Sequence, residues 1–122
     1  MLTVEEARFI VVSDIHKDSD DLTKYVICRE EEFEKGWCFN VQSRAYMETG
    51  DQYTMVIGAG PYVVDKYTGQ LHTYSSICSC MDAKRIYSET EKSGLDIEHA
   101  MWEKMKQENN ADIRGVLPDN TR

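Results

Sequence analysis

The strongest constraint on the fold is a strict alternation of side-chain character between Trp37 and Arg44. Alternate positions form two sets, Trp37, Phe39, Val41 and Ser43 against Cys38, Asn40, Gln42 and Arg44. Successive side chains of a β-strand point to opposite faces, so the pattern predicts a strand with one apolar face and one face in water. We take this strand as the anchor of the fold.

A second strand precedes it. Over residues 25–30 the period is also two, with Tyr25, Ile27 and Arg29 on one face and Val26, Cys28 and Glu30 on the other. The charged connection 31–36 ends in Gly36, which can adopt the positive φ that a hairpin loop needs, so the two strands are predicted to be antiparallel neighbours. With a loop centred near Phe33, Cys28 and Cys38 would lie opposite each other and pack as small apolar side chains.

Three further strands are predicted in the middle of the chain. Residues 53–57 fit a third strand, which the sequence Gly58-Ala59-Gly60-Pro61 ends because proline has no amide to donate to a ladder. Residues 62–65 fit a fourth strand, and the turn at Thr68-Gly69 leads into a fifth over residues 70–76. This region is therefore expected to form an antiparallel β-meander of about four to five strands.

Helices are predicted at both ends of the chain. Thr3 and Glu6 have the spacing of a capping box, and Val4, Ala7, Val11 and Ile15 recur at helical spacing, which predicts an N-terminal helix. The polar residues 17–21 that follow are typical of a loop.

One or two C-terminal helices are expected after the strands. Asp82 could cap a helix over residues 83–93 that ends at Gly94, and Asp96 could cap another over residues 97–107. In the second helix Ile97, Met101 and Met105 form an apolar stripe. The fold class is therefore α+β, as one domain over residues 1–108 with a helical extension at 95–108 and a mobile tail at 109–122.

Charge and hydropathy limit the location and the partners. The chain has 22 acidic and 14 basic residues and a net charge of -8, so nucleic acid should be repelled. Acidity of this size is also what keeps a small domain in solution. No apolar run has the length of a membrane span, and we expect a cytoplasmic protein without membrane contact. In that compartment Cys28, Cys38, Cys78 and Cys80 should be free thiols.

No group of residues predicts catalysis or a cofactor. His16 lies too close in sequence to Ser13 and Asp14 to form a nucleophile-base arrangement, and His72 and His99 have no partner that the sequence identifies. Residues 58–61 resemble a phosphate loop only superficially, because no Gly-Lys-Ser/Thr follows. A zinc site on the four cysteines remains a minor alternative, since their spacing is not that of a zinc knuckle. We expect no enzyme, no cofactor and no metal.

Two groups of residues are predicted to contact a protein partner. The first is the glutamate-rich hairpin, where an acidic loop could block a basic cleft and steer association; its members are Glu30, Glu31, Glu32 and Glu34. The second combines carboxylates with aromatic area that could anchor a partner; its members are Tyr46, Glu48, Asp51 and Tyr53. The alternative for the hairpin is an ordinary solvated turn.

Several short segments, in order and spacing, resemble the immunity protein 35 family. They are Gly36-Trp37-Cys38-Phe39, Met47-Glu48-Thr49-Gly50-Asp51, Gly58-Ala59-Gly60-Pro61, Val64-Asp65-Lys66 and Thr68-Gly69-Gln70-Leu71-His72. The resemblance extends from the N-terminal helix to about Tyr87. Two features depart from it: the family often has asparagine where Ala59 stands, and the chain beyond Gly94 exceeds the usual end.

The resemblance implies a small α+β domain that acts as the antidote in bacterial polymorphic toxin systems. Its partner would be a cognate toxin, encoded by the adjacent gene, whose active site the protein occludes. A related member is described as chaperone-like, which keeps open a second function as a holdase or adaptor that binds client proteins. Such a function would need exposed apolar surface rather than a charged patch.

Overall fold

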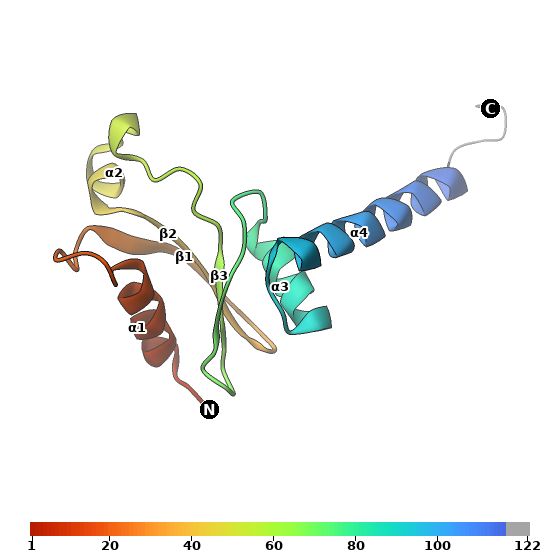
Figure 1. Ribbon diagram of the computed structural model, residues 1–122. Coiled ribbons are helices and arrows are strands. Elements are labelled where there is room, and N and C mark those ends of the chain that lie inside the picture. Colours follow the sequence, from red (N-terminus) through yellow and green to blue (C-terminus); the bar gives the residue numbers. More distant parts are fainter. Residues whose placement is uncertain (117–122) are drawn as a thin grey trace.

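The structure, a computed structural model, describes the backbone of residues 1–116 and the side chains of residues 1–108. The elements follow one another as α1 (Val4–Ile15), β1 (Tyr25–Phe33), β2 (Gly36–Ser43), α2 (Arg44–Thr49), the 3-10 helix η1 (Gln52–Thr54), β3 (Tyr62–Asp65), β4 (Leu71–Thr73), α3 (Cys80–Thr90) and α4 (Leu95–Val116). The predicted α+β class is confirmed, with an N-terminal helix, antiparallel strands and then two C-terminal helices (Figure 1).

The four strands form one antiparallel sheet in the order β1-β2-β3-β4, as expected for a meander. Helix α1 covers one face of this sheet, and α3 with the root of α4 covers the other (Figure 1). Each face carries its own apolar core. The α1-side core contains Ala7, Val11, Trp37, Phe39 and Val64. The α3-side core contains Cys38, Val63, Tyr74, Cys78, Cys80, Ala83, Ile86, Tyr87 and Met101.

Strand β2 therefore has no face in water where it crosses the centre of the sheet, and that prediction was wrong. Trp37 and Phe39 pack toward α1, as the alternation indicates, but Cys38 between them is fully buried against α3. Asn40, on the same face of β2, accepts a hydrogen bond from Cys80 at the start of α3. A pattern that suggests one wet face can thus also mark a face covered by a closely packed helix.

The β1-β2 hairpin is longer and tighter than predicted. Strand β1 continues to Phe33, which pairs with Gly36, so only Glu34 and Lys35 form the turn. Glu31 consequently lies opposite Cys38, and Cys28 sits at a bulge between Ile27 and Arg29. The predicted pairing of Cys28 with Cys38 was wrong, because the turn is centred between Glu34 and Lys35 and not near Phe33, so that Cys38 lies opposite Glu31; Cys28 lies in the bulge and is exposed.

Gly36 is required by contact with the next strand and not by its own dihedral angles. It is absent from the glycines with positive φ in the described chain, which are Gly50, Gly58, Gly69 and Gly94. A Cβ built on Gly36 would overlap the carbonyl oxygen of Val64 on β3. The prediction that Gly36 supplies a left-handed turn was wrong: the missing side chain allows two backbones to approach closely.

No strand forms over residues 53–57, where a third one was predicted. Asp51 caps η1, and the chain then crosses the end of β2 without entering the ladder. The Gln42 side chain takes the place of a strand there, since its Oε1 accepts the Val56 N–H at 2.6 Å and its Nε2 donates to the Val56 carbonyl at 3.4 Å. Because one side-chain amide satisfies both backbone groups, the segment stays extended but does not need a neighbouring strand.

The last strand and the C-terminal helices differ from prediction at their ends. Strand β4 stops at Thr73, because Glu98 of α4 accepts hydrogen bonds from Ser75 N at 3.2 Å and Ser75 Oγ at 2.5 Å. Helix α3 begins at Cys80 with Ser79 as its N-cap, and Asp82 closes the capping box from the third position. It ends at Thr90, and Glu91 is its C-cap, in the left-handed conformation with φ 54°. Gly94 had been predicted to end this helix.

Helix α4 starts two residues earlier than predicted and continues to Val116, into the segment expected to be a mobile tail. The remainder of that predicted tail, residues 117–122, lies outside the described residues.

The predicted N-terminal capping box is confirmed, with Thr3 Oγ1 accepting the Glu6 N–H and Glu6 accepting the Thr3 N–H. Among the described helices, none is long and apolar enough to cross a membrane.

Candidate protein-binding surfaces

Three of the four hairpin glutamates, Glu30, Glu31 and Glu32, lie on β1 and are paired with cations of this chain. Glu30 faces α1, where Arg8 donates to it from Nε at 2.5 Å and from Nη2 at 2.8 Å. Glu31 faces α3 and accepts from Lys84 Nζ at 2.9 Å, with Arg29 Nε at 2.7 Å. These hydrogen bonds lower the pKa of both carboxyl groups, so both are ionised and compensated locally.

Glu32 is compensated in the same way on the α1 side of the sheet. Lys66 Nζ donates to Glu32 Oε2 at 2.8 Å and also lies 5.2 Å from the centre of the Trp37 ring. Within the described ion pairs, Glu34 at the turn has none. The sequence places four carboxylates in one hairpin. Of these four, only Glu34 has no cation paired with it among the described ion pairs.

The second predicted group surrounds α2 and η1. Ser43 caps α2, Gly50 ends it in the left-handed conformation, and Asp51 caps η1 by accepting the Tyr53 N–H at 3.0 Å. The chain therefore folds into two short consecutive helical turns. These turns hold Tyr53 almost entirely in water, with an exposed fraction of 99%. Glu48 remains exposed and lies 3.9 Å from Arg44.

Three apolar residues that the sequence did not single out enlarge this surface. Ile57 is 86% exposed, and Met47 and Met55 are also exposed. Met47 lies on α2, whereas Met55 and Ile57 belong to the segment 53–57 that was predicted to be a strand, and both are exposed because no strand forms there. We call the resulting surface the α2-η1 patch; it consists of Tyr46, Met47, Glu48, Asp51, Tyr53, Met55 and Ile57.

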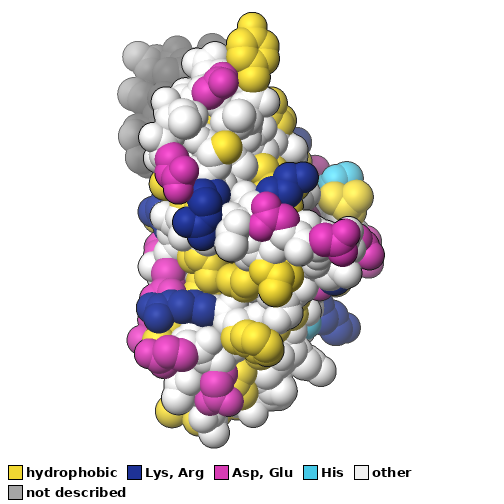
Figure 2. Space-filling view, turned by 90° about the vertical axis from the view of Figure 1, so that its left-hand side faces the viewer, with side chains coloured by type: hydrophobic (Ala, Val, Ile, Leu, Met, Phe, Trp, Pro, Cys, Tyr) yellow, Lys and Arg dark blue, Asp and Glu magenta, His cyan; other side chains and the backbone are white. Residues whose placement is uncertain are grey.

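Figure 2 shows the face of the molecule that carries α1 and the end with α2 and η1. Hydrophobic side chains emerge at its upper end, above a belt of charged groups, and others gather lower down over the helix. Phe9 on α1 is 72% exposed and borders a shallow hollow with Leu2, Ile10 and Gly69. Apolar area is therefore spread over more than one part of this face.

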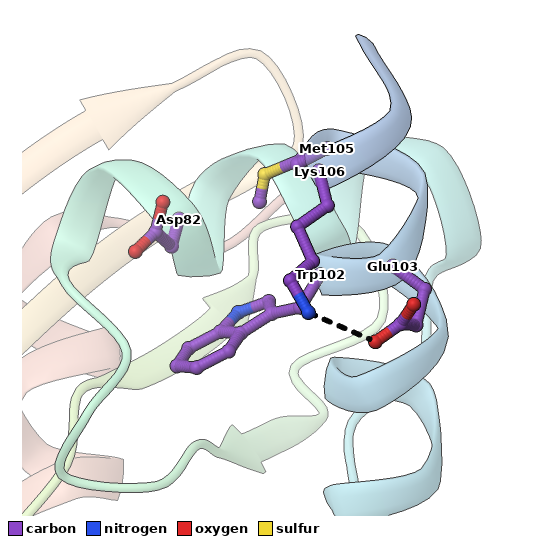
Figure 3. Close-up of a pocket in the computed structure, with 5 residues that line it drawn as sticks. All are labelled: Asp82, Trp102, Glu103, Met105 and Lys106. Carbon is purple, nitrogen blue, oxygen red and sulfur yellow. Dashed lines mark ion pairs between the residues drawn. The ribbon is translucent and has the colours of Figure 1, made fainter. Parts of the chain in front are cut away.

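A third surface lies between α3 and α4. Figure 3 shows the Trp102 indole extending from α4 toward α3, with Asp82 across the space and Met105 beside it. The hollow measures about 310 Å³. Glu103 and Lys106 form an ion pair of 3.7 Å at its rim. The Trp102 Nε1 atom is buried and has no hydrogen-bond partner within the described chain.

Two of the three histidines, His16 and His72, make contacts that join elements of the fold. His16 is buried, its Nδ1 lies 2.8 Å from the Val12 carbonyl and its Nε2 accepts the Tyr25 N–H at 3.1 Å, so the ring joins α1 to β1. His72 contacts Ser93 Oγ at 3.3 Å and the Tyr87 ring. Across the described residues, no three His, Cys, Asp or Glu side chains are grouped to hold a metal ion.

Together these features define a small α+β domain that exposes apolar and acidic side chains on several elements. The family model described as Immunity protein 35 matches residues 6–90, and the chain belongs to the immunity protein 35 family. This membership supports an immunity function in general terms. The match includes the hairpin and the α2-η1 patch and excludes α4.

One curated relative is an uncharacterised protein, YrhB, of Escherichia coli strain K12. It is 35% identical over 48 residues, which is 39% of this chain and 51% of that protein. The matched segment thus spans about half the length of the relative. No solved structure matches the chain.

Proposed function

We propose that the protein is a non-enzymatic immunity protein that binds a cognate bacterial toxin and neutralises it by occluding its active site. The toxin would be encoded by the adjacent gene, and the complex would form in the cytoplasm. Neither nucleic acid nor a membrane takes part in this proposal, because the net charge of -8 opposes binding to phosphate backbones.

The observation that carries the proposal is the exposure of Tyr53 and Ile57 inside the family-matched region. Large side chains in water are tolerated singly, but a group of them beside carboxylates has the composition of an interface centre with a charged rim. Tyrosine in particular supplies a large, rigid contact area. We therefore assign toxin binding to the α2-η1 patch, with Glu48 and Asp51 as rim residues.

The first experiment expresses the C-terminal domain of the neighbouring gene's product with and without this protein. We expect growth only when both are present, and co-purification of the pair. Absence of rescue together with absence of a complex would contradict the immunity function.

A second experiment locates the contact. Tyr53→Ala should weaken toxin binding at least tenfold if this ring fills a pocket on the partner, since truncation of an anchor residue costs about 2 kcal/mol or more and tenfold corresponds to about 1.4 kcal/mol. The matched control is Tyr67→Ala, because Tyr67 is also an exposed tyrosine, 64%, but lies at the β3-β4 turn. Equal affinities for both variants would exclude the patch as the contact.

The hairpin needs a charge test that leaves the fold intact. Reversal of Glu31 or Glu32 would also remove the ion pairs with Lys84 and Lys66, so Glu34→Lys is the cleaner probe. If the turn contributes to steering, this variant should slow association and flatten its salt dependence. Asp18→Lys, in the loop after α1, is the control of equal charge change. An unchanged association rate would remove the hairpin from the interface.

Exposed apolar area also favours a second candidate, a holdase or adaptor for client proteins. Phe9, Ile57 and Leu22 are each more than half exposed, on separate elements. This function predicts that the protein slows aggregation of unrelated unfolded proteins at stoichiometric amounts. Selective binding to a single toxin, without any effect on such aggregation, would decide for the immunity function.

A further inference from the structure

Two of the four thiols are in direct contact inside the α3-side core. Cys38 on β2 lies with its Sγ 3.0 Å from Sγ of Cys80, the first residue of α3, although 42 positions separate them in the sequence. Cys80 in turn donates to Asn40 Oδ1 at 3.0 Å. The two thiols and the amide thus form a short chain of hydrogen bonds that joins the sheet to the helix.

The surroundings of Cys80 favour its reactive form. Its position at the start of α3 places it in the positive end of the helix dipole, and Arg29 and Lys84 lie nearby, where they are paired with Glu31, whose charge acts in the opposite direction. The hydrogen bond from Cys38 lowers the pKa of Cys80, and this effect exceeds the opposing effect of burial. The neighbouring Cys78 is different, because burial raises its pKa to about 12 and keeps it a thiol.

We propose that Cys38 and Cys80 are an oxidation site, at which hydrogen peroxide converts the paired thiols into a disulfide between β2 and α3. The site is independent of the toxin-binding function proposed above. Cys80 is 4% exposed and Cys38 fully buried, so we expect a reagent as small as peroxide to react at Cys80 in preference to a bulky disulfide reagent.

The reaction balances in two steps. The Cys80 thiolate attacks one peroxide oxygen, the O–O bond breaks, and Cys80 becomes a sulfenic acid with release of hydroxide. Cys38 then attacks the sulfur of Cys80, the S–O bond breaks, and the proton of Cys38 leaves with the departing oxygen as water. Two thiols and one peroxide thus give one disulfide and two waters, with one electron lost by each sulfur and gained by each peroxide oxygen.

The test treats the folded protein with hydrogen peroxide, quenches it, and alkylates the remaining thiols after unfolding. We expect alkylation of two of the four cysteines, a cross-linked peptide containing Cys38 and Cys80, and reversal by dithiothreitol. A disulfide that contains Cys28 or Cys78, or four alkylated cysteines after a dose that oxidises the unfolded chain, would overturn the proposal. This measurement uses the unaltered protein and does not depend on any variant folding.

Two variants identify the roles of the sulfurs. Cys38→Ser should stop the reaction at an oxidised Cys80 without a cross-link, whereas Cys28→Ser, at an exposed thiol, should leave the cross-link intact. A cross-link that persists in Cys38→Ser would overturn the pairing.

The oxidised protein should also melt several degrees above the reduced one, because the bond restricts the unfolded chain; a lower melting temperature would show that the native geometry does not accommodate the disulfide.

Discussion

Gly36 shows how a single absent side chain fixes the distance between two strands. Because a Cβ there would overlap the Val64 carbonyl, Gly36→Ala must separate β2 from β3 or bend one of them. We expect a loss of about 3 kcal/mol in the free energy of unfolding, measured in urea. Gly50→Ala is the control: Gly50 has φ 71° but open space around it, so only about 1 kcal/mol should be lost. Equal losses would contradict the steric explanation.

His16 acts as a hydrogen-bonding link between α1 and β1. Its replacement by alanine leaves the Tyr25 N–H without its acceptor and removes a buried ring, which should cost roughly 1–3 kcal/mol of stability. The exposed His99 offers the comparison, since His99→Ala should change stability by less than about 0.5 kcal/mol. Denaturant titration of both variants measures the difference, and a stable His16→Ala protein would show that the link is dispensable.

His72 makes stability depend on pH in a defined direction. Burial lowers its pKa below 6.5, partly offset by Asp65, and its Nε2 has no acceptor within the described chain. The unfolded chain therefore binds this proton more tightly than the folded protein, so the contribution is fully present above 6.5 and is lost as the pH falls below it.

The variant His72→Asn should reduce the difference in melting temperature between about pH 7.5 and about pH 5.5, because asparagine does not titrate in this range. His99→Asn should leave that difference unchanged, since His99 is exposed on α4. A pH dependence that is the same in both variants would assign the effect to other groups.

At the scale of the elements, helix α4 is attached to the family-matched body by few but specific contacts. Glu98 is buried and accepts from Ser75, Met101 enters the α3-side core, and Arg85 of α3 pairs with Glu108 at 2.8 Å. The contacts lie in the part of α4 that is closest to α3. This arrangement makes α4 the element whose docking can be tested separately from the sheet.

Met101→Ala should loosen α4 before it unfolds the sheet. Loss of a buried methionine costs about 2–5 kcal/mol in a well-packed core, and here the helix can partly detach. Hydrogen exchange should therefore accelerate in α4 while the amides of α1 keep their protection. Glu103→Ala, an exposed change on the same helix, should leave both unchanged. Uniform acceleration across the protein would show that α4 is part of one cooperative unit.

The elements also show what could be predicted from sequence. Local signals were sufficient for the Thr3-Glu6 capping box, for β3 and for the alternation of β2, because each depends on neighbours a few residues apart. Contacts between distant segments were not accessible in this way. The overlap of Gly36 with Val64 and the bonds from Gln42 to Val56 are examples, and they decided the hairpin turn and the absence of a strand at 53–57.

The same division between local and long-range features applies to the candidate site. The sequence suggested Tyr53 and its neighbouring carboxylates as a contact, and the structure adds that Tyr53, Glu48 and Asp51 are exposed; their role in binding stays a prediction. The partners of Glu31 and Glu32 were not predictable, since Lys84 and Lys66 lie 53 and 34 positions away in sequence. Ile57 was missed because an apolar run was interpreted as a buried strand.

At the scale of the whole molecule, two cores share the same strands. Trp37 and Phe39 belong to one core and Cys38 to the other, so neither core can be lost without disturbing β2. We expect one cooperative unfolding transition. In Trp102→Phe, Trp37 is the sole tryptophan, and its fluorescence should change at the same urea concentration as the far-ultraviolet circular dichroism. Separate midpoints would show that the two layers unfold independently.

Helix α4 extends well away from the sheet, as Figure 1 shows, and its contacts with the rest of the described chain include those of Glu98, Met101 and Glu108. Its 22 residues make a rod of about 33 Å, so a tilt of about 10° at the root displaces the far end by about 6 Å. A small change of tilt at the start of the helix would therefore move its far end by several ångströms. A partner that binds the outer turns of α4 would shift the packing of Met101 and Glu98. Conversely, a small change in the packing of these two residues would change the position of the outer turns much more.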